Sequence, residues 1–216
     1  MAKKVTKELA EIRGIPAGID LRSPSRHPDI LGADDLVIKI EEFREATGYR
    51  LPVSVKLGAG RVRDDIKIAY KDGFDYVCLD GVQGSTGAAS NEVLEFVGIP
   101  TLSGIMEALD ALEEIEATGM PLVLMGGVKD GIDTAKAIAL GAKAVAIGHS
   151  AMMALNCNKE IPGVTDYEGT VGVPAGQCYH CHTGRCPVGV ATQDPELRKR
   201  LVVEEASERV YNFLTA

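Results

Sequence analysis

A group of closely spaced cysteines has the most specific chemistry in this sequence. Three cysteines form a C-x2-C-x4-C pattern with a proline directly after the last: Cys178, Cys181 and Cys186, then Pro187. Thiolates are soft anionic ligands, and an iron–sulfur cluster needs several of them to converge on one small inorganic core. The spacing therefore predicts a loop that binds an iron–sulfur cluster.

Three other interpretations of these cysteines stay open at this point. The stretch from Cys178 to His182 also matches the C-x-x-C-H pattern of c-type haem attachment, which belongs to exported proteins, and no export signal is present. Three cysteines with His180 or His182 would suit a zinc ion. Cysteines without a metal are the plainest alternative, but thiols this close together would be prone to oxidation.

Two glycine-rich turns each follow a short apolar run. The first is Met125-Gly126-Gly127, and the second is Ile147-Gly148-His149. Such turns place exposed backbone N–H groups beside helix starts, as in the phosphate-binding loops after the last two strands of (β/α)8 barrels. Glycine at such a turn is also compatible with tight packing alone.

Two more stretches could bind a ligand. Lys56 is a cation inside the otherwise apolar run VSVKL, and because burying an unpaired ammonium group is costly, we expect it to pair with an electron-rich cofactor or a substrate carboxylate. The alternative is that Lys56 keeps its charge in water at the rim of the fold. The loop Asp80–Ala88 is rich in Gly, Ser and Thr, which suits an anionic or planar ligand and equally a simple flexible connection.

Short apolar runs alternate with helical patterns along the middle of the chain. Apart from Ser54 and Lys56, the runs are continuously apolar, as expected for parallel strands covered on both faces; they span 53–57, 76–79, 122–125 and 144–147. The helical patterns span 34–47, 62–71, 105–117, 132–140 and 150–156. Four βα units in a row predict an α/β fold with a parallel sheet, and four units are half of a (β/α)8 barrel.

Segments of another character flank these units. A short helix is expected at 6–13, and 194–214 has the pattern of an amphipathic helix opened by Asp194 and Pro195. From the N-terminus, we expect an extension (1–33), a half-barrel (34–156), a cluster loop (157–193) and a C-terminal helix (194–216).

Composition and charge exclude several classes of protein. The net charge of −8 argues against a nucleic-acid binder, because a surface that follows phosphates needs an excess of Lys and Arg. No apolar run approaches the length of a membrane span, and the N-terminus lacks the apolar core of an export signal. We therefore expect a cytoplasmic protein that binds neither nucleic acid nor membrane.

Six segments, in this order, resemble the FMN-binding barrel of glutamate synthase, particularly the archaeal-type enzymes. The segments are GIDLRSPSRHPDI, VSVKLG, LDGVQGSTGAA, LMGGVKDGID, AIGHSAMMALNC and CHTGRCPVGVATQDPELRKR. Together they cover nearly the whole chain, and the last is highly specific. The resemblance implies the C-terminal half of a (β/α)8 barrel that binds FMN and an iron–sulfur cluster.

The resemblance also implies roles for particular residues. Lys56 would contact the flavin and, with Gln83, act in catalysis. The loop from Gly84 to Ala88 would face the flavin and the substrate, with Ser85 and Thr86 among its cofactor-binding residues. The residues implied to hold the FMN phosphate are Gly126, Gly127, Gly148 and His149.

The reaction implied by the resemblance is the reduction of 2-iminoglutarate, formed from 2-oxoglutarate and ammonia, to glutamate. Reduced FMN would supply the hydride, and the cluster would relay electrons to the flavin. The alternative is a half-barrel that carries an iron–sulfur cluster for electron transfer or assembly without catalysing this reaction.

The sequence departs from the family pattern in cysteine spacing and in length. The residue that directly follows the last barrel helix in this chain is Cys157, and about 20 residues separate it from Cys178. Four candidate ligands, Cys157 with Cys178, Cys181 and Cys186, make a [4Fe–4S] cluster as reasonable as a [3Fe–4S] cluster. Because the family barrel has eight strands, we expect a partner chain that supplies the first four, or a homodimer of two halves. Glutaminase and electron-donor subunits are further candidate partners.

Overall fold

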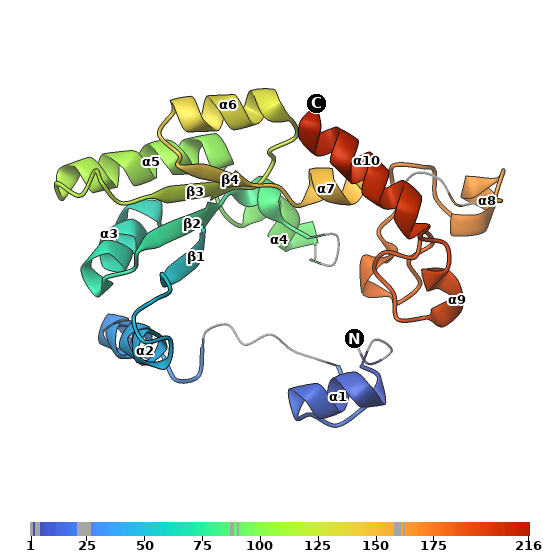
Figure 1. Ribbon diagram of the computed structural model, residues 1–216, viewed down its shortest axis with the longest axis horizontal. Helices are drawn as coiled ribbons and strands as arrows, with labels where there is room; N and C mark the ends of the chain where they lie inside the picture. The colour runs from blue at the N-terminus through green and yellow to red at the C-terminus, as the bar shows by residue number, and fades with distance from the viewer. Residues whose placement is uncertain are drawn as a thin grey trace. The chain divides into compact units, whose positions relative to one another are not determined.

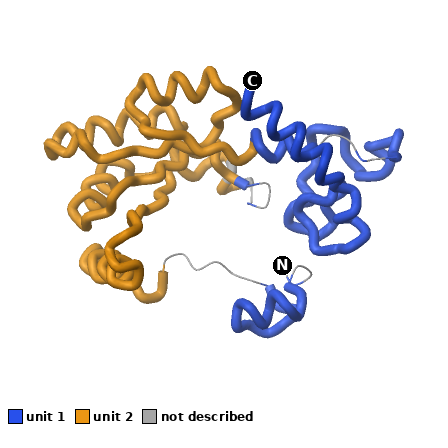
Figure 2. Tube along the Cα trace, in the orientation of Figure 1, with its two compact units in different colours: residues 1–23, 86–89, 150–216 blue, residues 24–85, 90–149 orange. Residues whose placement is uncertain are grey.

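The computed structural model describes residues 2, 5–20, 27–86, 89, 91–157, 161 and 163–216. Parts of three segments discussed above lie outside these residues: 21–26 of the N-terminal extension, Gly87 and Ala88 of the glycine-rich loop, and 158–160 with 162 after Cys157. The chain divides into two compact units (Figure 2). The sheet unit comprises 24–85 and 90–149, and the cysteine unit comprises 1–23, 86–89 and 150–216.

The sheet unit is built on four parallel strands (Figure 1). In order of sequence they are β1 (Ser54–Gly58), β2 (Tyr76–Asp80), β3 (Leu122–Met125) and β4 (Ala144–Ala146), and each pairs with the next. Successive crossovers in one direction keep this order, whereas a doubly wound sheet reverses direction at a switch point. The predicted α/β fold with four βα units, a partial (β/α)8 barrel, is therefore confirmed.

One face of the sheet packs against helices and forms the core. Its side chains come from alternate strand positions: Val55, Leu57, Val77, Leu79, Leu122, Leu124 and Val145. Two amphipathic helices, α3 (Val62–Asp72) and α5 (Thr101–Glu114), pack against each other and against this face. Ile66 of α3, and Ile105 and Leu112 of α5, are fully buried there. The helical spacing of these apolar residues explains why both segments form helices.

The remaining elements complete the two units. In the sheet unit they are α2 (Ala33–Ala46), the 3-10 turn η2 (Val82–Gly84), α4 (Asn91–Phe96) and α6 (Gly131–Ala139). In the cysteine unit they are α1 (Lys7–Arg13), α8 (Tyr167–Val171), the 3-10 turn η3 (His180–His182), α9 (Pro195–Arg198) and α10 (Val203–Thr215). Helix α7 (His149–Ala154) runs from the first unit into the second. No helix in the described ranges combines the length and hydropathy of a membrane span.

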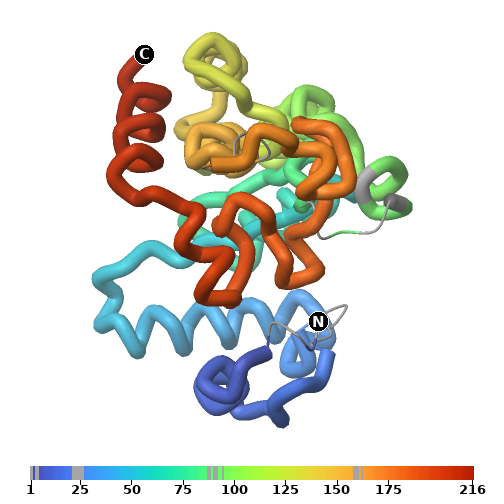
Figure 3. Tube along the Cα trace, turned by 90° about the vertical axis from the view of Figure 1, so that its right-hand side faces the viewer, coloured from blue at the N-terminus to red at the C-terminus, as the bar shows by residue number. Residues whose placement is uncertain are grey.

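The prediction of one continuous helix over 194–214 is wrong, because the segment forms α9 and α10 with a turn between them (Figure 3). The loop that follows Cys186 packs against the end of α9. A side chain on Gly189 would lie 2.5 Å from the carbonyl oxygen of Leu197, and Arg200 Nη1 donates a hydrogen bond of 2.8 Å to the carbonyl oxygen of Pro187. These contacts form only in the folded chain, so the amphipathic pattern did not reveal the break.

Candidate functional site

The carboxyl ends of β1 and β2 bring a cation and a carboxylate together. Lys56 Nζ lies 2.8 Å from Asp80 Oδ2; the Lys56 side chain is 62% exposed and that of Asp80 only 15%. Lys56 thus pairs with a carboxylate of its own chain and keeps most of its side chain in solvent, and its pairing with a cofactor or a substrate carboxylate stays a prediction. Asp80 was missing from the predicted site residues. Register could have indicated it, because Lys56 pairs with Cys78 and a residue two positions further along β2 points to the same face.

Gln83 lies in η2, directly after β2, beside the start of α5. Its carboxamide oxygen accepts hydrogen bonds from the backbone nitrogen and the hydroxyl of Thr101, both at 2.9 Å. Because α5 has no side-chain cap at its own N-cap, Pro100, Gln83 satisfies a first-turn N–H in its place. The Thr101 hydroxyl also lies 2.8 Å from the carbonyl oxygen of Gly126. Gln83 is exposed, and among the hydrogen bonds between described residues its carboxamide NH2 group donates none, so its donation to a ligand stays a prediction.

Two of the predicted cofactor-binding glycines, Gly84 and Gly126, lie against Asp80, and a third, Gly127, lies against Gln83. A side chain on Gly84 would overlap the Asp80 carboxylate, and one on Gly126 would lie 3.1 Å from Asp80 Oδ1 and 2.9 Å from the Gly84 nitrogen. Gly126 and Gly127 also have φ angles of +96° and +79°, which L side chains rarely adopt. Packing within the chain accounts for these glycines. The predicted contacts of Gly84 with the flavin and of Gly126 and Gly127 with its phosphate stay predictions.

The helices after the two glycine-rich turns begin differently. At α6, Asp130 accepts a hydrogen bond from the Asp133 nitrogen (2.9 Å) and Asp133 accepts one from the Lys129 nitrogen (3.3 Å). These carboxylates already satisfy N–H groups and would repel a phosphate. Open space surrounds the position where Gly148 would carry a side chain, and His149 is exposed. The turn before α7 is therefore the more accessible of the two.

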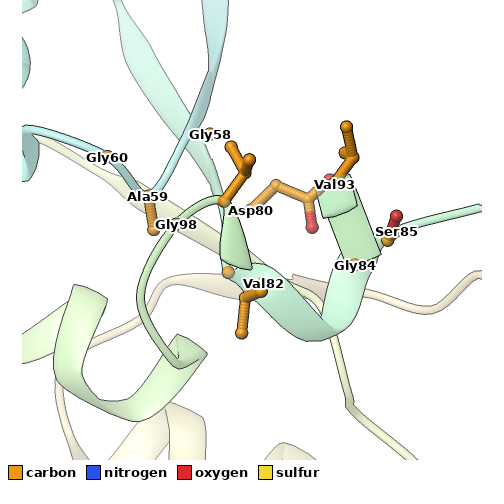
Figure 4. Close-up of a pocket in the computed structure, with 11 residues that line it drawn as sticks. Gly58, Ala59, Gly60, Asp80, Val82, Gly84, Ser85, Val93 and Gly98 are labelled. Carbon is orange, nitrogen blue, oxygen red and sulfur yellow. The ribbon is translucent and has the colours of Figure 1, made fainter. Parts of the chain in front are cut away.

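A cavity of about 270 Å³ opens at the ends of β1 and β2 (Figure 4). Gly58, Asp80, Gly84 and Ser85 contribute backbone and polar groups to its wall, and Val93 contributes apolar surface. Apolar surface with a few polar groups is typical of sites for small molecules. The predicted residue Thr86 is exposed and belongs to the cysteine unit.

The four predicted cluster ligands all lie in the cysteine unit. Burial, together with the nearby thiolates of Cys181, Cys186 and Cys178, raises the pKa of Cys157 to about 11. The long insertion after Cys157 thus does not separate it from the other three cysteines. The fifth cysteine, Cys78, lies on β2 in the sheet unit, and none of the five takes part in a disulfide within the described residues.

The residues between Cys157 and Cys178 help to support the cysteine loop. Tyr167 of α8 hydrogen-bonds with Cys178; burial and the neighbouring Cys178 thiolate raise the pKa of Tyr167 to about 12. The ring nitrogen Nε2 of His180 lies 3.1 Å from the carbonyl oxygen of Val171. A buried group joins the insertion to the loop: Ile161, Val171, Cys186 and Val188. Nothing in the sequence pattern pointed to Tyr167.

In this conformation, no three of the described His, Cys, Asp and Glu side chains converge closely enough to hold one metal ion. The zinc site stays an untested alternative. The ligands of an iron–sulfur cluster surround a larger inorganic core, so the cluster stays a prediction.

Comparison with known proteins identifies relatives of this chain. The family model "Conserved region in glutamate synthase" matches residues 1–216. The chain is 44% identical to a glutamate synthase large subunit-like protein of Rhizobium meliloti, over 99% of this chain and 48% of that protein. It is 39% identical to an archaeal-type glutamate synthase (NADPH) of Thermotoga neapolitana, over 99% of this chain and 39% of that protein.

The match to solved structures is looser. A flavocytochrome b2 mutant with benzoylformate has a TM-score of 0.43 and 26% identity, over 67% of this chain and 31% of that one. The curated relatives above are matched along the whole chain, which spans less than half of their length. On the family model and these relatives together, the chain belongs to the glutamate synthase family.

Proposed function

We propose that this chain is the FMN- and iron–sulfur-binding part of an oxidoreductase of the glutamate synthase type. The reaction is the reduction of 2-iminoglutarate, formed from 2-oxoglutarate and ammonia, to glutamate. The observation that carries the proposal is the gathering of four cysteines in one compact unit of a chain that matches the family throughout. Relatives named glutamate synthase (NADPH) support the reaction class. A cytoplasmic location, where thiols stay reduced, suits cysteines that form no disulfide among the described residues.

The chemistry of the donor set fits a cluster. Four thiolates close together repel one another, which contributes to the raised pKa of Cys157, and bound iron would compensate this negative charge. Cys178 and Cys186 also pack among apolar side chains, which limits their contact with water. Three of the cysteines would suffice for a [3Fe–4S] cluster, and Cys157 is the fourth ligand that a [4Fe–4S] cluster requires.

The carboxyl ends of the strands suit a flavin and an anionic substrate, because the loops there carry function in (β/α)8 barrels. When bound, FMN supplies the hydride. Lys56 contributes positive charge for the flavin ring or a substrate carboxylate, and Gln83 orients a ligand through its carboxamide NH2 group. Gly148 and His149 offer accessible N–H groups to the FMN phosphate.

The partners follow from the reaction and from the sheet. A partner chain, or a second copy of this one, would supply the strands that complete the barrel. A glutaminase would supply ammonia, and an electron-donor subunit would supply reducing equivalents. Both are proposed as partners because the chain spans only 39–48% of the curated relatives.

The test is the cofactor content of protein purified without oxygen. We expect iron, acid-labile sulfide and FMN in stoichiometric amounts, with a visible spectrum of a flavin superimposed on that of a cluster. Cys181→Ser should lose most of the iron, because it removes one soft ligand. Cys78→Ser is the matched control, since Cys78 lies in the other unit, and it should keep its iron.

Other cofactor contents would contradict the proposal or favour an alternative. Protein without iron or labile sulfide would sink the proposal, and a colourless protein that contains zinc would replace it with a zinc site. Iron and sulfide without flavin would favour a half-barrel that transfers electrons or serves assembly without catalysing the reaction.

A further inference from the structure

The ion pair at the ends of β1 and β2 is built asymmetrically. Lys56 extends into solvent along most of its side chain, whereas Asp80 is largely buried. Asp80 is the last residue of β2 and lies beside Gly58 in the register, so no side chain of β1 separates its carboxylate from the Lys56 ammonium group. The carboxylate is the fixed member of the pair, and the cation is the member that can reach a ligand.

Neighbouring segments hold Asp80 in place. Its carbonyl oxygen accepts a hydrogen bond from the Ala59 nitrogen at 2.8 Å, and the next residue, Gly81, donates to the carbonyl oxygen of Met125 at 3.1 Å. These bonds fix the end of β2 between β1 and β3. The carboxylate projects toward the loop of Gly84, where only a residue without a side chain leaves it room (Figure 4).

Folding alone does not explain a carboxylate at this position. Asp80 Oδ1 is buried, and within the described residues it has no hydrogen-bond partner. A buried charged oxygen left unpaired lowers stability, so an apolar side chain of similar size would be the better choice for folding. The other oxygen of the same carboxylate faces Lys56.

We propose that Asp80 is a positioning residue that fixes the ammonium group of Lys56 where the ligand binds. Gly84 and Gly126 are glycines because their side chains would displace the Asp80 carboxylate. This inference rests on the proposed function, in which the ligand is FMN, and adds Asp80 to the residues proposed for the flavin site.

A double-mutant cycle on the full chain tests the positioning role of Asp80. The variants are Lys56→Gln, Asp80→Asn and the combination of both, and the measurements are the Kd for FMN and the midpoint of thermal unfolding. We expect Lys56→Gln to weaken FMN binding by roughly 3- to 30-fold, the range covered by the loss of one close charge contact. Asp80→Asn should weaken it similarly, and the double variant no more than Lys56→Gln alone.

The direction in which Asp80→Asn changes the Kd for FMN distinguishes a positioning role of Asp80 from a simple electrostatic effect of its charge. FMN is an anion, so removal of a nearby negative charge would by itself tighten its binding. A positioning role predicts weaker binding when Lys56 is present and no further loss when it is absent. Asp80→Asn should shift the midpoint of thermal unfolding only slightly, because it removes the buried charge but leaves a polar amide at the same position. Asp80→Ser serves as a second variant if the asparagine does not fold.

The remaining outcomes are distinguishable. If Lys56→Gln weakens FMN binding while Asp80→Asn leaves it unchanged or tightens it, the positioning role is overturned and the proposed function stands. Effects that add in the double variant also overturn it, since Asp80 would then act independently of Lys56. If wild type binds no FMN, or Lys56→Gln has no effect, the flavin site of the proposed function fails and this inference with it.

Discussion

The glycines Gly84 and Gly148 differ in whether the fold leaves room for a side chain at their position. At Gly84 the space is filled by the Asp80 carboxylate, so the fold itself requires a glycine. At Gly148 the space is open and the backbone conformation is one that other residues adopt, so the fold does not. A glycine that the fold does not require is the better candidate for close approach of a ligand to the backbone.

Substitution by alanine at these two positions should separate stability from binding. Gly84→Ala should lower the free energy of unfolding by about 1–3 kcal/mol, because the new methyl group overlaps Asp80. Gly148→Ala should change it by less than about 0.5 kcal/mol and should weaken FMN binding if the phosphate sits against this turn. Denaturant titration and an FMN binding curve measure the two effects. Equal stability of both variants would contradict the packing argument.

Helix α3 shows how one element can carry favourable and unfavourable charge at its two ends. Asp64 is exposed in the first turn, where the helix dipole favours a carboxylate. Asp72 closes the last turn, where the dipole disfavours one, and it is buried with its Oδ2 unpaired among the described atoms. Burial raises the pKa of Asp72 above its ordinary value of 3.8, and the charge of Asp34 adds to the rise.

Neutralising these two residues should therefore have opposite effects. At pH 7 we expect Asp72→Asn to stabilise the fold by about 1 kcal/mol, and Asp64→Asn to destabilise it by up to about 1 kcal/mol. Because the raised pKa belongs to the folded state, wild type loses stability as the pH rises from below 3.8 through the folded pKa. The advantage of Asp72→Asn should thus vanish below pH 3.8 and stay constant well above the folded pKa. Denaturant titrations across this range check the sign; an advantage independent of pH would contradict it.

On the scale of the whole molecule, the sheet is only part of a closed barrel. In the part of the chain that the structure describes, β1 and β4 are edge strands. The face that carries Lys56 and Cys78 lies opposite the buried core face. Open edges and uncovered sheet faces invite further strands.

This architecture predicts association. In size-exclusion chromatography with light scattering, we expect the isolated chain to run as a dimer or larger species, or to become monodisperse only with a partner that supplies strands. A monomer that unfolds in one cooperative transition would count against both the homodimer and the partner chain that supplies strands.

Local patterns in the sequence were sufficient to predict the strands, most of the helices and the family. Short, mostly apolar runs mark β1 to β4, because one face of each strand packs in the core, and closely spaced cysteines mark the loop from Cys178. These features depend on neighbours in the sequence, so they can be read without knowing the fold.

Only the tertiary structure decided which distant residues meet. It paired Lys56 with Asp80 through strand register and placed Gln83 at the start of α5. It also brought Cys157 near the other cysteines across the insertion, and broke the C-terminal helix where a loop packs against it. Each of these contacts joins segments far apart in the chain. Their formation depends on how close two backbones come after packing, which local periodicity does not record.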